Sequence, residues 1–340
     1  MKGRLMKVSS LGALLLAFYL LLDTFLFLSL PPNFGAEERN VLIPKGSTFK
    51  EILHILKEEE LLRSPTRFYL MARILGATGR VKAGEYGLST SMLPQDILQK
   101  LVQGEVIKYR ITILEGYNVR QIAAYLKEKG IINRQEEFLK LAFSCEFAAS
   151  LGIEGEGVEG YLFPDTYLFS RGLAPEEVIK TMVGNFKEVY KPEFSLRAAE
   201  LGLTDREVII LASIIEKETG LNEERPLISA VFHNRLKRGI PLCSDPTVIY
   251  GLEDFDGNLR KEDLKRRTPY NTYLIRGLPP GPIANPGRSS IWAALYPAPV
   301  KYLYFVSRND GSHHFSVSLR EHNEAVWRYQ RGGKGGLKWK

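Results

Sequence analysis

Cysteine is scarce in this chain, since Cys145 and Cys243 are the only two among 340 residues. A disulfide-stabilised scaffold is therefore excluded, because such scaffolds depend on several bridges. The sequence leaves open whether these two thiols pair. Histidine is also scarce, with five residues, and the histidines lack the ligand constellation of a metal site. We therefore expect no metal and no other cofactor.

Acidic residues are fewer than basic ones, with 39 Asp and Glu against 46 Lys and Arg, for a net charge of +7 at pH 7. This balance fits an anionic neighbour, such as lipid head groups or a cell-wall polymer. The basic residues are scattered, apart from 265–267 and a Gly- and Lys-rich stretch over 332–340, which we expect to be a flexible basic tail. Nucleic acid is not an expected partner. The apolar content of 44% is that of a protein with ordinary cores.

One long apolar run covers residues 11–30, with Asp23 as its only charge. Its length is about that needed to span a bilayer. Basic residues precede it and acidic residues follow it, which predicts a cytoplasmic N-terminus over 1–10 and the rest of the chain outside. We expect a single-pass anchor in the cytoplasmic (inner) membrane, with a cleaved signal peptide as the alternative.

The chain contains an internal duplication with an offset of 70 residues. The stretch VLIPKGSTFKEILHILKEEELL from Val41 aligns with ITILEGYNVRQIAAYLKEKGII from Ile111. Each copy reads as a short strand, a Gly turn and an amphipathic helix, with a second helix beginning near Pro65 or Gln135. Between the copies, another helix is expected to start at Pro94, a favoured first helical residue.

Residues 204–220, TDREVIILASIIEKETG, read as one helix. Thr204 and Glu207 make a capping box, and Gly220 is the expected C-terminal stop. At about 100° per residue, Glu218 falls in the middle of the apolar stripe, whereas Glu216 falls on the opposite face. The pattern predicts that Glu216 is an ordinary solvated charge.

A carboxyl group on a buried stripe must be paired, protonated or facing a cleft. Burial and the negative end of the helix dipole both favour the neutral acid, which suits a general acid working near neutral pH. The alternative for Glu218 is a structural ion pair with a Lys or Arg. The helix alone does not decide between them.

After Gly155 the sequence becomes rich in Tyr, Pro and Asn, with polar groups among aromatic ones. A carbohydrate cleft needs that mixture, although the same residues also build turns and cores. Asp165, Asp245 and Asn271 each lie beside Pro or Tyr in such loops, where local backbone caps are common.

Six motifs occur in order along the chain and together resemble the YceG-like family of membrane-anchored endolytic murein transglycosylases. They are EGYLFPDTY (159–167), ASIIEKET (212–219), DPTVIYG (245–251), TPYNTY (268–273), GLPPGPIANPG (277–287) and HFSVSLREHN (314–323). The resemblance covers nearly the whole chain. One departure lies before Ser244, where Gln is frequent in the family and this chain has Cys243.

The resemblance implies cleavage of the β-1,4 bond between N-acetylmuramic acid and N-acetylglucosamine in peptidoglycan, without water, leaving a 1,6-anhydro-muramic end. It places the single catalytic acid and base on Glu218. It assigns substrate positioning or support of Glu218 to further matching positions, which are Asp165, Asp245, Tyr270, Asn271 and His313. The His322–Asn323 pair also matches, and for the histidines a structural or substrate-contact role is favoured over a metal site.

The implied partners are peptidoglycan glycan strands, the cytoplasmic membrane and, as candidates, peptidoglycan synthases (penicillin-binding proteins). Two other functions stay open. One is a muramidase-type hydrolase with Asp165 or Asp245 as the second carboxylate. The other is a non-catalytic wall-binding scaffold.

We therefore expect an α+β fold with an N-terminal transmembrane helix, LysM-like strand-helix modules and a mixed catalytic domain. The expected division places the LysM-like module at 40–107, a second repeat or connecting subdomain at 108–150 and the catalytic domain at 155–330. Whether either repeat copy binds glycan is left open.

Overall fold

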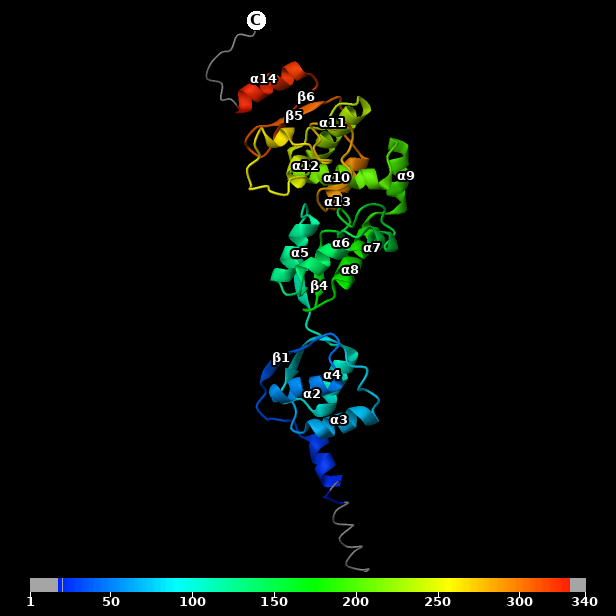
Figure 1. Ribbon diagram of the computed structural model, residues 1–340, viewed down its shortest axis with the longest axis vertical. Coiled ribbons are helices and arrows are strands. Elements are labelled where there is room, and N and C mark those ends of the chain that lie inside the picture. The colour runs from blue at the N-terminus through cyan, green and yellow to red at the C-terminus, as the bar shows by residue number, and fades with distance from the viewer. Residues whose placement is uncertain (1–17, 20, 331–340) are drawn as a thin grey trace, which may run out of the picture. The chain divides into compact units, whose positions relative to one another are not determined.

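The computed structural model describes residues 18, 19 and 21–330 (Figure 1). Within them, short strands form three two-stranded sheets, β1–β2, β3–β4 and β5–β6, and most of the remaining regular structure is helical. The predicted α+β class is confirmed. The predicted cytoplasmic N-terminus over 1–10 and the basic tail over 332–340 lie outside the described residues.

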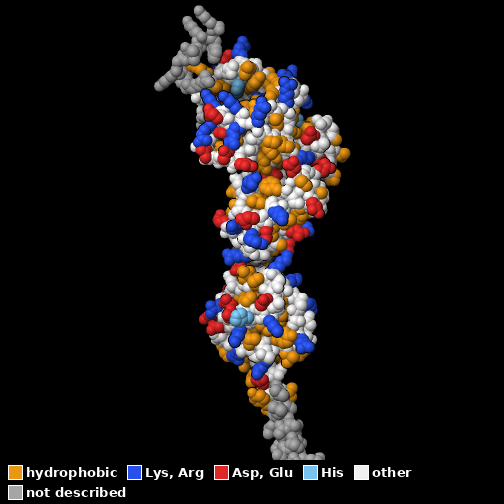
Figure 2. Space-filling model, in the orientation of Figure 1, with side chains coloured by type: hydrophobic (Ala, Val, Ile, Leu, Met, Phe, Trp, Pro, Cys, Tyr) orange, Lys and Arg blue, Asp and Glu red, His pale blue; other side chains and the backbone are white. Residues whose placement is uncertain are grey.

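The chain packs as two compact units. The first extends to Arg110 and includes Leu168–Leu173, and the second combines Ile111–Tyr167 with the chain from Ala174 onward. The functional division expected from the sequence, including the LysM-like module, stays a prediction. On the face shown in Figure 2, Lys and Arg side chains are interspersed with Asp and Glu.

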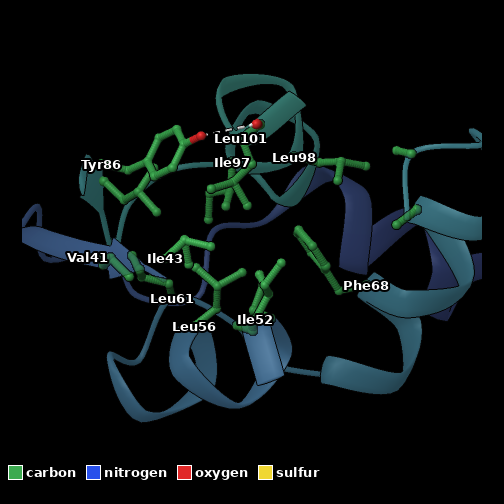
Figure 3. Close-up of a cluster of buried hydrophobic side chains, with 14 of the residues drawn as sticks. Val41, Ile43, Ile52, Leu56, Leu61, Phe68, Tyr86, Ile97, Leu98 and Leu101 are labelled. Atoms are coloured by element: carbon green, nitrogen blue, oxygen red, sulfur yellow. Dashed lines mark hydrogen bonds between the residues drawn. The ribbon is translucent and has the colours of Figure 1, made fainter. Parts of the chain in front are cut away.

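The first unit has an antiparallel β-ribbon and three helices around one core. Its elements are β1 (Glu38–Ile43), α2 (Phe49–Glu58), α3 (Pro65–Ile74), β2 (Gly84–Ser89) and α4 (Pro94–Gln103). Val41 of β1 lies opposite Tyr86 of β2. Leu56 and Phe68 join them in the buried cluster, where the Tyr86 hydroxyl donates to the Leu101 carbonyl at 3.2 Å (Figure 3). Burying these side chains supplies the main stabilisation of the unit.

The prediction of a transmembrane helix over 11–30 is contradicted. Among the described residues no helix is long and apolar enough to cross a membrane, and residues 11–17 and 20 of the predicted span lie outside them. Two side chains in the described part of the run make contacts within the first unit. Asp23 forms an ion pair with Arg67 at 2.6 Å, and Phe27 is buried in the core. One apolar side chain of this run therefore packs in the core of the first unit, whereas others, such as Leu21 and Phe25, are exposed.

The second unit carries most of the helices. Strands β3 (Tyr109–Thr112) and β4 (Thr166–Phe169) form a sheet, and β5 (Tyr304–Ser307) pairs antiparallel with β6 (His313–Ser316). The helices up to α9 are α5 (Val119–Glu128), α6 (Gln135–Ala142), α7 (Cys145–Ser150), α8 (Pro175–Val189) and α9 (Pro192–Leu201). The later ones are α10 (Asp205–Glu218), α11 (Arg225–Lys237), α12 (Asp245–Tyr250), η1 (Asp263–Lys265), α13 (Arg288–Leu295) and α14 (Leu319–Gln330).

Helix α10 is central to the second unit. It packs against α9, α11, α12 and α13, and its residues from Val208 to Ile215 are all buried. A helix buried on several sides is held in a fixed position by its neighbours. The end of α10 is therefore a rigid place for a functional group.

The duplication predicted from the sequence is confirmed in three dimensions. In both copies a strand leads through a glycine with positive φ, Gly46 (86°) or Gly116 (76°), into a helix with a capping box, α2 or α5. The second helix of each copy begins where expected, α3 at Pro65 and α6 at Gln135, and α4 begins at Pro94.

The two copies differ where their first helix ends, and this difference predicts a stabilising change. Glu60 has φ 59° and its counterpart Gly130 has φ 70°. A side chain at such a position costs about 1 kcal/mol, because Cβ crowds the following carbonyl. Glu60→Gly should therefore raise the free energy of unfolding by about 0.5–1 kcal/mol in urea titrations of the full chain. Gly130→Ala is the matched control, and it should lower that free energy by a similar amount.

Candidate functional site

The candidate site is built around Glu218, the last residue of α10. Thr204 and Glu207 make the predicted capping box at the start of this helix. The end differs from the prediction, because Thr219 is already extended, with φ −147° and ψ 142°, and Gly220 does not adopt a left-handed conformation. Glu218 is therefore the last residue of α10, and a loop begins at Thr219.

The Glu218 carboxyl is partly buried and accepts one short hydrogen bond. Ser244 Oγ donates to Glu218 Oε1 at 2.5 Å. Burial raises the pKa of Glu218 to about 7, and the negative charge of Asp245 adds to this, while the Ser244 hydrogen bond and the positive charge of Arg235 lower it. A carboxyl with this pKa is present in both protonation states near neutral pH, as acid and base catalysis requires.

The loop that carries Ser244 is held from two sides. Arg235 on α11 donates from Nη1 to the Leu242 carbonyl at 2.6 Å and from Nε to the Leu303 carbonyl at 2.7 Å. Thr272 accepts from the backbone N–H of Ser244 at 3.0 Å. The Ser244 side chain is thereby fixed toward Glu218. The sequence reading missed Ser244, although it stands directly before Asp245 in a quoted motif.

Asp245 and Glu218 are brought together, as the resemblance implied. Asp245 begins α12 and accepts a hydrogen bond from the Tyr273 hydroxyl at 2.6 Å. Burial and the neighbouring carboxylate raise the pKa of Tyr273 well above its usual value, so this hydroxyl stays protonated and remains a donor. Tyr273 is a second residue that the sequence reading missed.

The other positions implied by the resemblance contact the loops around the site. Asn271 is fully buried and donates to the carbonyls of Leu264 (3.0 Å) and Arg266 (2.8 Å), so it holds the loop leading to Tyr273. Tyr270 contacts Tyr250, with ring centroids 4.8 Å apart, and both line a small cavity of about 60 Å³.

Asp165 and His313 make their contacts elsewhere. Asp165 accepts from the Thr166 backbone N–H at 2.6 Å and from Asn185 Nδ2 at 3.0 Å. Among the described residues, neither of these contacts connects Asp165 to Glu218. His313 Nδ1 lies 2.6 Å from Glu224 Oε2, which also accepts from the Thr219 hydroxyl at 3.3 Å. His313 therefore reaches the residue after Glu218 through Glu224.

The sequence also raised the role of the histidines and the pairing of the two cysteines. His322 stacks on Tyr304 with centroids 5.2 Å apart. The described residues contain no group of three or more His, Cys, Asp or Glu side chains that could hold a metal ion. Cys145 and Cys243 are both free and exposed, which answers the question of pairing.

The prediction that Glu216 is a solvated charge is wrong. Its side chain is only 5% exposed and lies 3.1 Å from Arg225 Nη2, and its Oε2 accepts from the Gly287 backbone N–H at 2.9 Å. The helical wheel identifies the face turned to the main core, but segments distant in sequence also cover the opposite face at this end of α10. The structural ion pair considered for Glu218 is thus formed by Glu216.

A second buried carboxylate, Glu159, was also missed. Val119 N–H donates to both of its oxygens at 3.1 Å, and Tyr250 Oη and Asn285 Nδ2 each donate at 3.1 Å. Burial raises the pKa of Glu159 to about 7. Because these donors occupy its oxygens, Glu159 serves to join the start of α5 to α12 and the loop at Asn285. Glu159 is the first residue of the EGYLFPDTY motif, in which only Asp165 was predicted to have a role.

Two substitutions should move the pKa of Glu218 in opposite directions. Ser244→Ala removes the hydrogen bond that favours the ionised carboxyl, so the pKa should rise by about 0.5–1 unit. Asp245→Asn removes a negative charge, so the pKa should fall. Titration of the carboxyl ¹³C resonance measures both, and an unchanged pKa in both variants would contradict this description of the site.

The chain is similar to proteins of one known family over most of its length. A family model described as the YceG-like family matches residues 41–328. A protein from Bacillus subtilis (strain 168) named endolytic murein transglycosylase is 35% identical over 308 residues, covering 85% of this chain and 84% of that protein. A protein of the same name from Streptococcus pneumoniae (serotype 2, strain D39) is 30% identical over 315 residues, covering 84% of this chain and 57% of that protein.

A solved structure agrees with these matches. The crystal structure of a yceG-like protein from Listeria monocytogenes is similar with a TM-score of 0.58 and 33% sequence identity, covering 85% of this chain and 98% of that chain. The fold, and not only short motifs, is therefore shared.

Proposed function

Since this chain belongs to the YceG-like family, we propose that it is an endolytic murein transglycosylase, the activity for which its relatives from Bacillus and Streptococcus are named. Its substrate is the peptidoglycan glycan strand, cut within the strand at the β-1,4 bond between N-acetylmuramic acid and N-acetylglucosamine. The observation that carries the proposal is the partly buried Glu218 carboxyl with a pKa of about 7.

A single carboxyl can perform both halves of the reaction. Protonated Glu218 donates its proton to the glycosidic oxygen, the bond from the anomeric carbon to that oxygen breaks, and the N-acetylglucosamine leaves with the proton. The C6 hydroxyl oxygen of the muramic residue then bonds to the anomeric carbon, and the Glu218 carboxylate takes the hydroxyl proton. The acid is regenerated and no water is consumed.

The neighbours of Glu218 suit this alternation. Asp245 favours the protonated carboxyl needed at the start, whereas Ser244 and Arg235 favour the carboxylate formed midway. With the pKa about 7, neither protonation state is strongly disfavoured near neutral pH. We propose catalysis by Glu218 and support by Ser244, Asp245 and Arg235.

The proposal is tested by digesting purified peptidoglycan with the full chain and weighing the products. New muramic ends should be lighter by one water than hydrolytic ends. Fragments from the interior of the strands should appear early, because the cut is endolytic. Hydrolytic ends as the main product would overturn the proposal.

A muramidase-type hydrolase is the second candidate, favoured by one observation. Asp245 lies close enough to Glu218 for its charge to raise the Glu218 pKa, and a hydrolase uses a second carboxylate to activate water or attack the sugar. Asp165 lacks this support, because its carboxylate contacts Thr166 and Asn185. The origin of the oxygen at the new end separates the two functions.

We also propose that the second unit works outside the cytoplasm, where peptidoglycan strands are found. An association with peptidoglycan synthases stays a prediction from the family resemblance.

A further inference from the structure

The turn of the second repeat copy, residues 114–118, lies against the end of α10. Lys217, the residue before Glu218, donates from Nζ to the Gly116 carbonyl at 3.2 Å. The Gly116 backbone N–H in turn donates to the Asn285 carbonyl at 3.0 Å. The last turn of α10 is therefore tied to a residue 101 positions earlier in the chain.

The same turn contributes a charge to the buried ion pair of α10. Arg225 Nη2 lies 3.1 Å from Glu216 Oε1 and 3.8 Å from Glu115 Oε2. The Glu115 carboxyl also packs against Gly287, where any Cβ would collide with it. Burial and the nearby Glu216 raise the pKa of Glu115. Both residues before Glu218 are thus held by the second copy, Lys217 directly and Glu216 through Arg225.

The first copy shows that this docking is not inherent in the repeated sequence. At the offset of 70, Lys45 corresponds to Glu115, so the charge is reversed, and Lys45 is exposed. A Cβ added at Gly46 would have no neighbour within 4 Å, whereas at Gly116 it would lie 3.5 Å from Glu216 and 3.6 Å from Lys217. The second copy therefore has a turn specialised for contact with α10.

We propose that Glu115 and Lys217 are positioning residues, which set the last turn of α10 so that the Glu218 carboxyl stays on Ser244. Glu218 is the final helical residue, and the chain after it is extended at Thr219. Helical hydrogen bonds therefore hold it only from the N-terminal side, and anchoring at 216–217 supplies the missing constraint. This inference rests on the proposed function, because it concerns the acid of that reaction.

A displaced carboxyl should change both rate and pH dependence. A shift of about 1 Å at a reacting group can lower the rate by about 100-fold. The groups facing Glu218 are Ser244, Asp245, Arg235 and Tyr273. Movement away from Ser244 removes a hydrogen bond that lowers the pKa of Glu218, while burial and Asp245 continue to raise it. The alkaline limb of the pH profile should then move to higher pH.

The test uses the full chain acting on soluble, uncross-linked glycan strands, with anhydro ends counted by mass spectrometry. Glu115→Lys gives the second copy the residue of the first, and Lys217→Met removes the hydrogen bond to Gly116 together with one positive charge. Lys45→Glu is the matched control, because it makes the reciprocal change in the first copy. Thermal unfolding of each variant measures the folded fraction at the assay temperature.

We expect kcat to fall about 10- to 100-fold in Glu115→Lys and Lys217→Met, with KM within about threefold and the alkaline limb moved upward. Lys45→Glu should match the unchanged protein. Folded variants with unchanged kcat would overturn the inference, as would a loss matching only the unfolded fraction. A rise in KM alone would also overturn it, since it would indicate glycan contact by the turn. A wild-type chain that forms no anhydro ends would instead overturn the proposed function.

Discussion

Glu218→Gln is expected to lower the rate of anhydro-end formation by about 10³-fold or more. A general acid or base contributes about 10²–10⁴-fold, and here one group performs both steps. Gln keeps the size of the side chain but can neither give nor take the proton. The initial rate on soluble glycan strands measures the loss, with Glu223→Gln, an exposed residue five positions further on, as the matched control.

The same substitution should stabilise the protein at neutral and alkaline pH. The pKa of Glu218 is raised from 4.5 to about 7 in the folded state, so the folded protein binds this proton more tightly than the unfolded chain. Stability from this group is full below about pH 4.5 and is lost as the pH rises through about 7. Gln does not titrate, so Glu218→Gln should gain about 1–3 kcal/mol above pH 7.

Loss of activity together with a gain in stability distinguishes a functional acid from a structural one. A structural ion-pair partner would lose stability on the same substitution. An active Glu218→Gln enzyme, or one destabilised at pH 8, would contradict the assignment of Glu218 as the acid.

Glu216→Gln should have the opposite effect, with a loss of about 3–5 kcal/mol in the free energy of unfolding. The substitution removes the nearer carboxylate from the buried Arg225 and leaves only Glu115, whose Oε2 is 3.8 Å away and whose side chain is half exposed. Breaking a buried pair from one side is strongly destabilising. Urea titration at 15 °C measures the change. Folded Glu216→Gln protein should still make anhydro ends, although about 10- to 100-fold more slowly, because Glu216 positions the end of α10 and does not itself transfer the proton.

A double substitution provides the control. Replacing Glu216 and Arg225 together by Met removes both charges, so the loss should be smaller than the sum of the two single losses. Additive losses would show that the two side chains do not act as a pair. A Glu216→Gln variant that is fully stable but inactive would reverse the roles of the two glutamates.

Local features of this fold could be predicted from the sequence because their causes are local. The Thr204 hydroxyl and Glu207 carboxylate satisfy donors within the same turn, so the start of α10 was visible in four residues. The duplication was visible for a similar reason, since each strand-turn-helix copy repeats the residues of its own turn and capping box.

The features that could not be predicted depend on segments far apart in the chain. Glu216 is buried by Arg225 and the backbone of Gly287. A helical wheel of α10 cannot show either contact, because both residues lie outside that helix. Ser244 reaches Glu218 across 26 residues. Glu159 accepts from Val119 and Asn285, each more than 30 residues away.

The apolar run near the N-terminus shows the limit of composition alone. Its length predicted a membrane span, yet Phe27 packs in the core of the first unit and Asp23 pairs with Arg67. A hydropathy pattern does not identify the environment that buries the apolar side chains. Of the large apolar side chains that the structure describes in this run, Phe27 is buried, whereas others such as Phe18, Leu21 and Phe25 are exposed.

The most direct test of the central claim is digestion of peptidoglycan by the full chain in H₂¹⁸O. If Glu218 acts alone, first as acid and then as base, the C6 hydroxyl closes the new end and no ¹⁸O enters it. The account therefore predicts unlabelled anhydro ends that disappear in Glu218→Gln. Labelled reducing ends formed by the wild-type protein would contradict it.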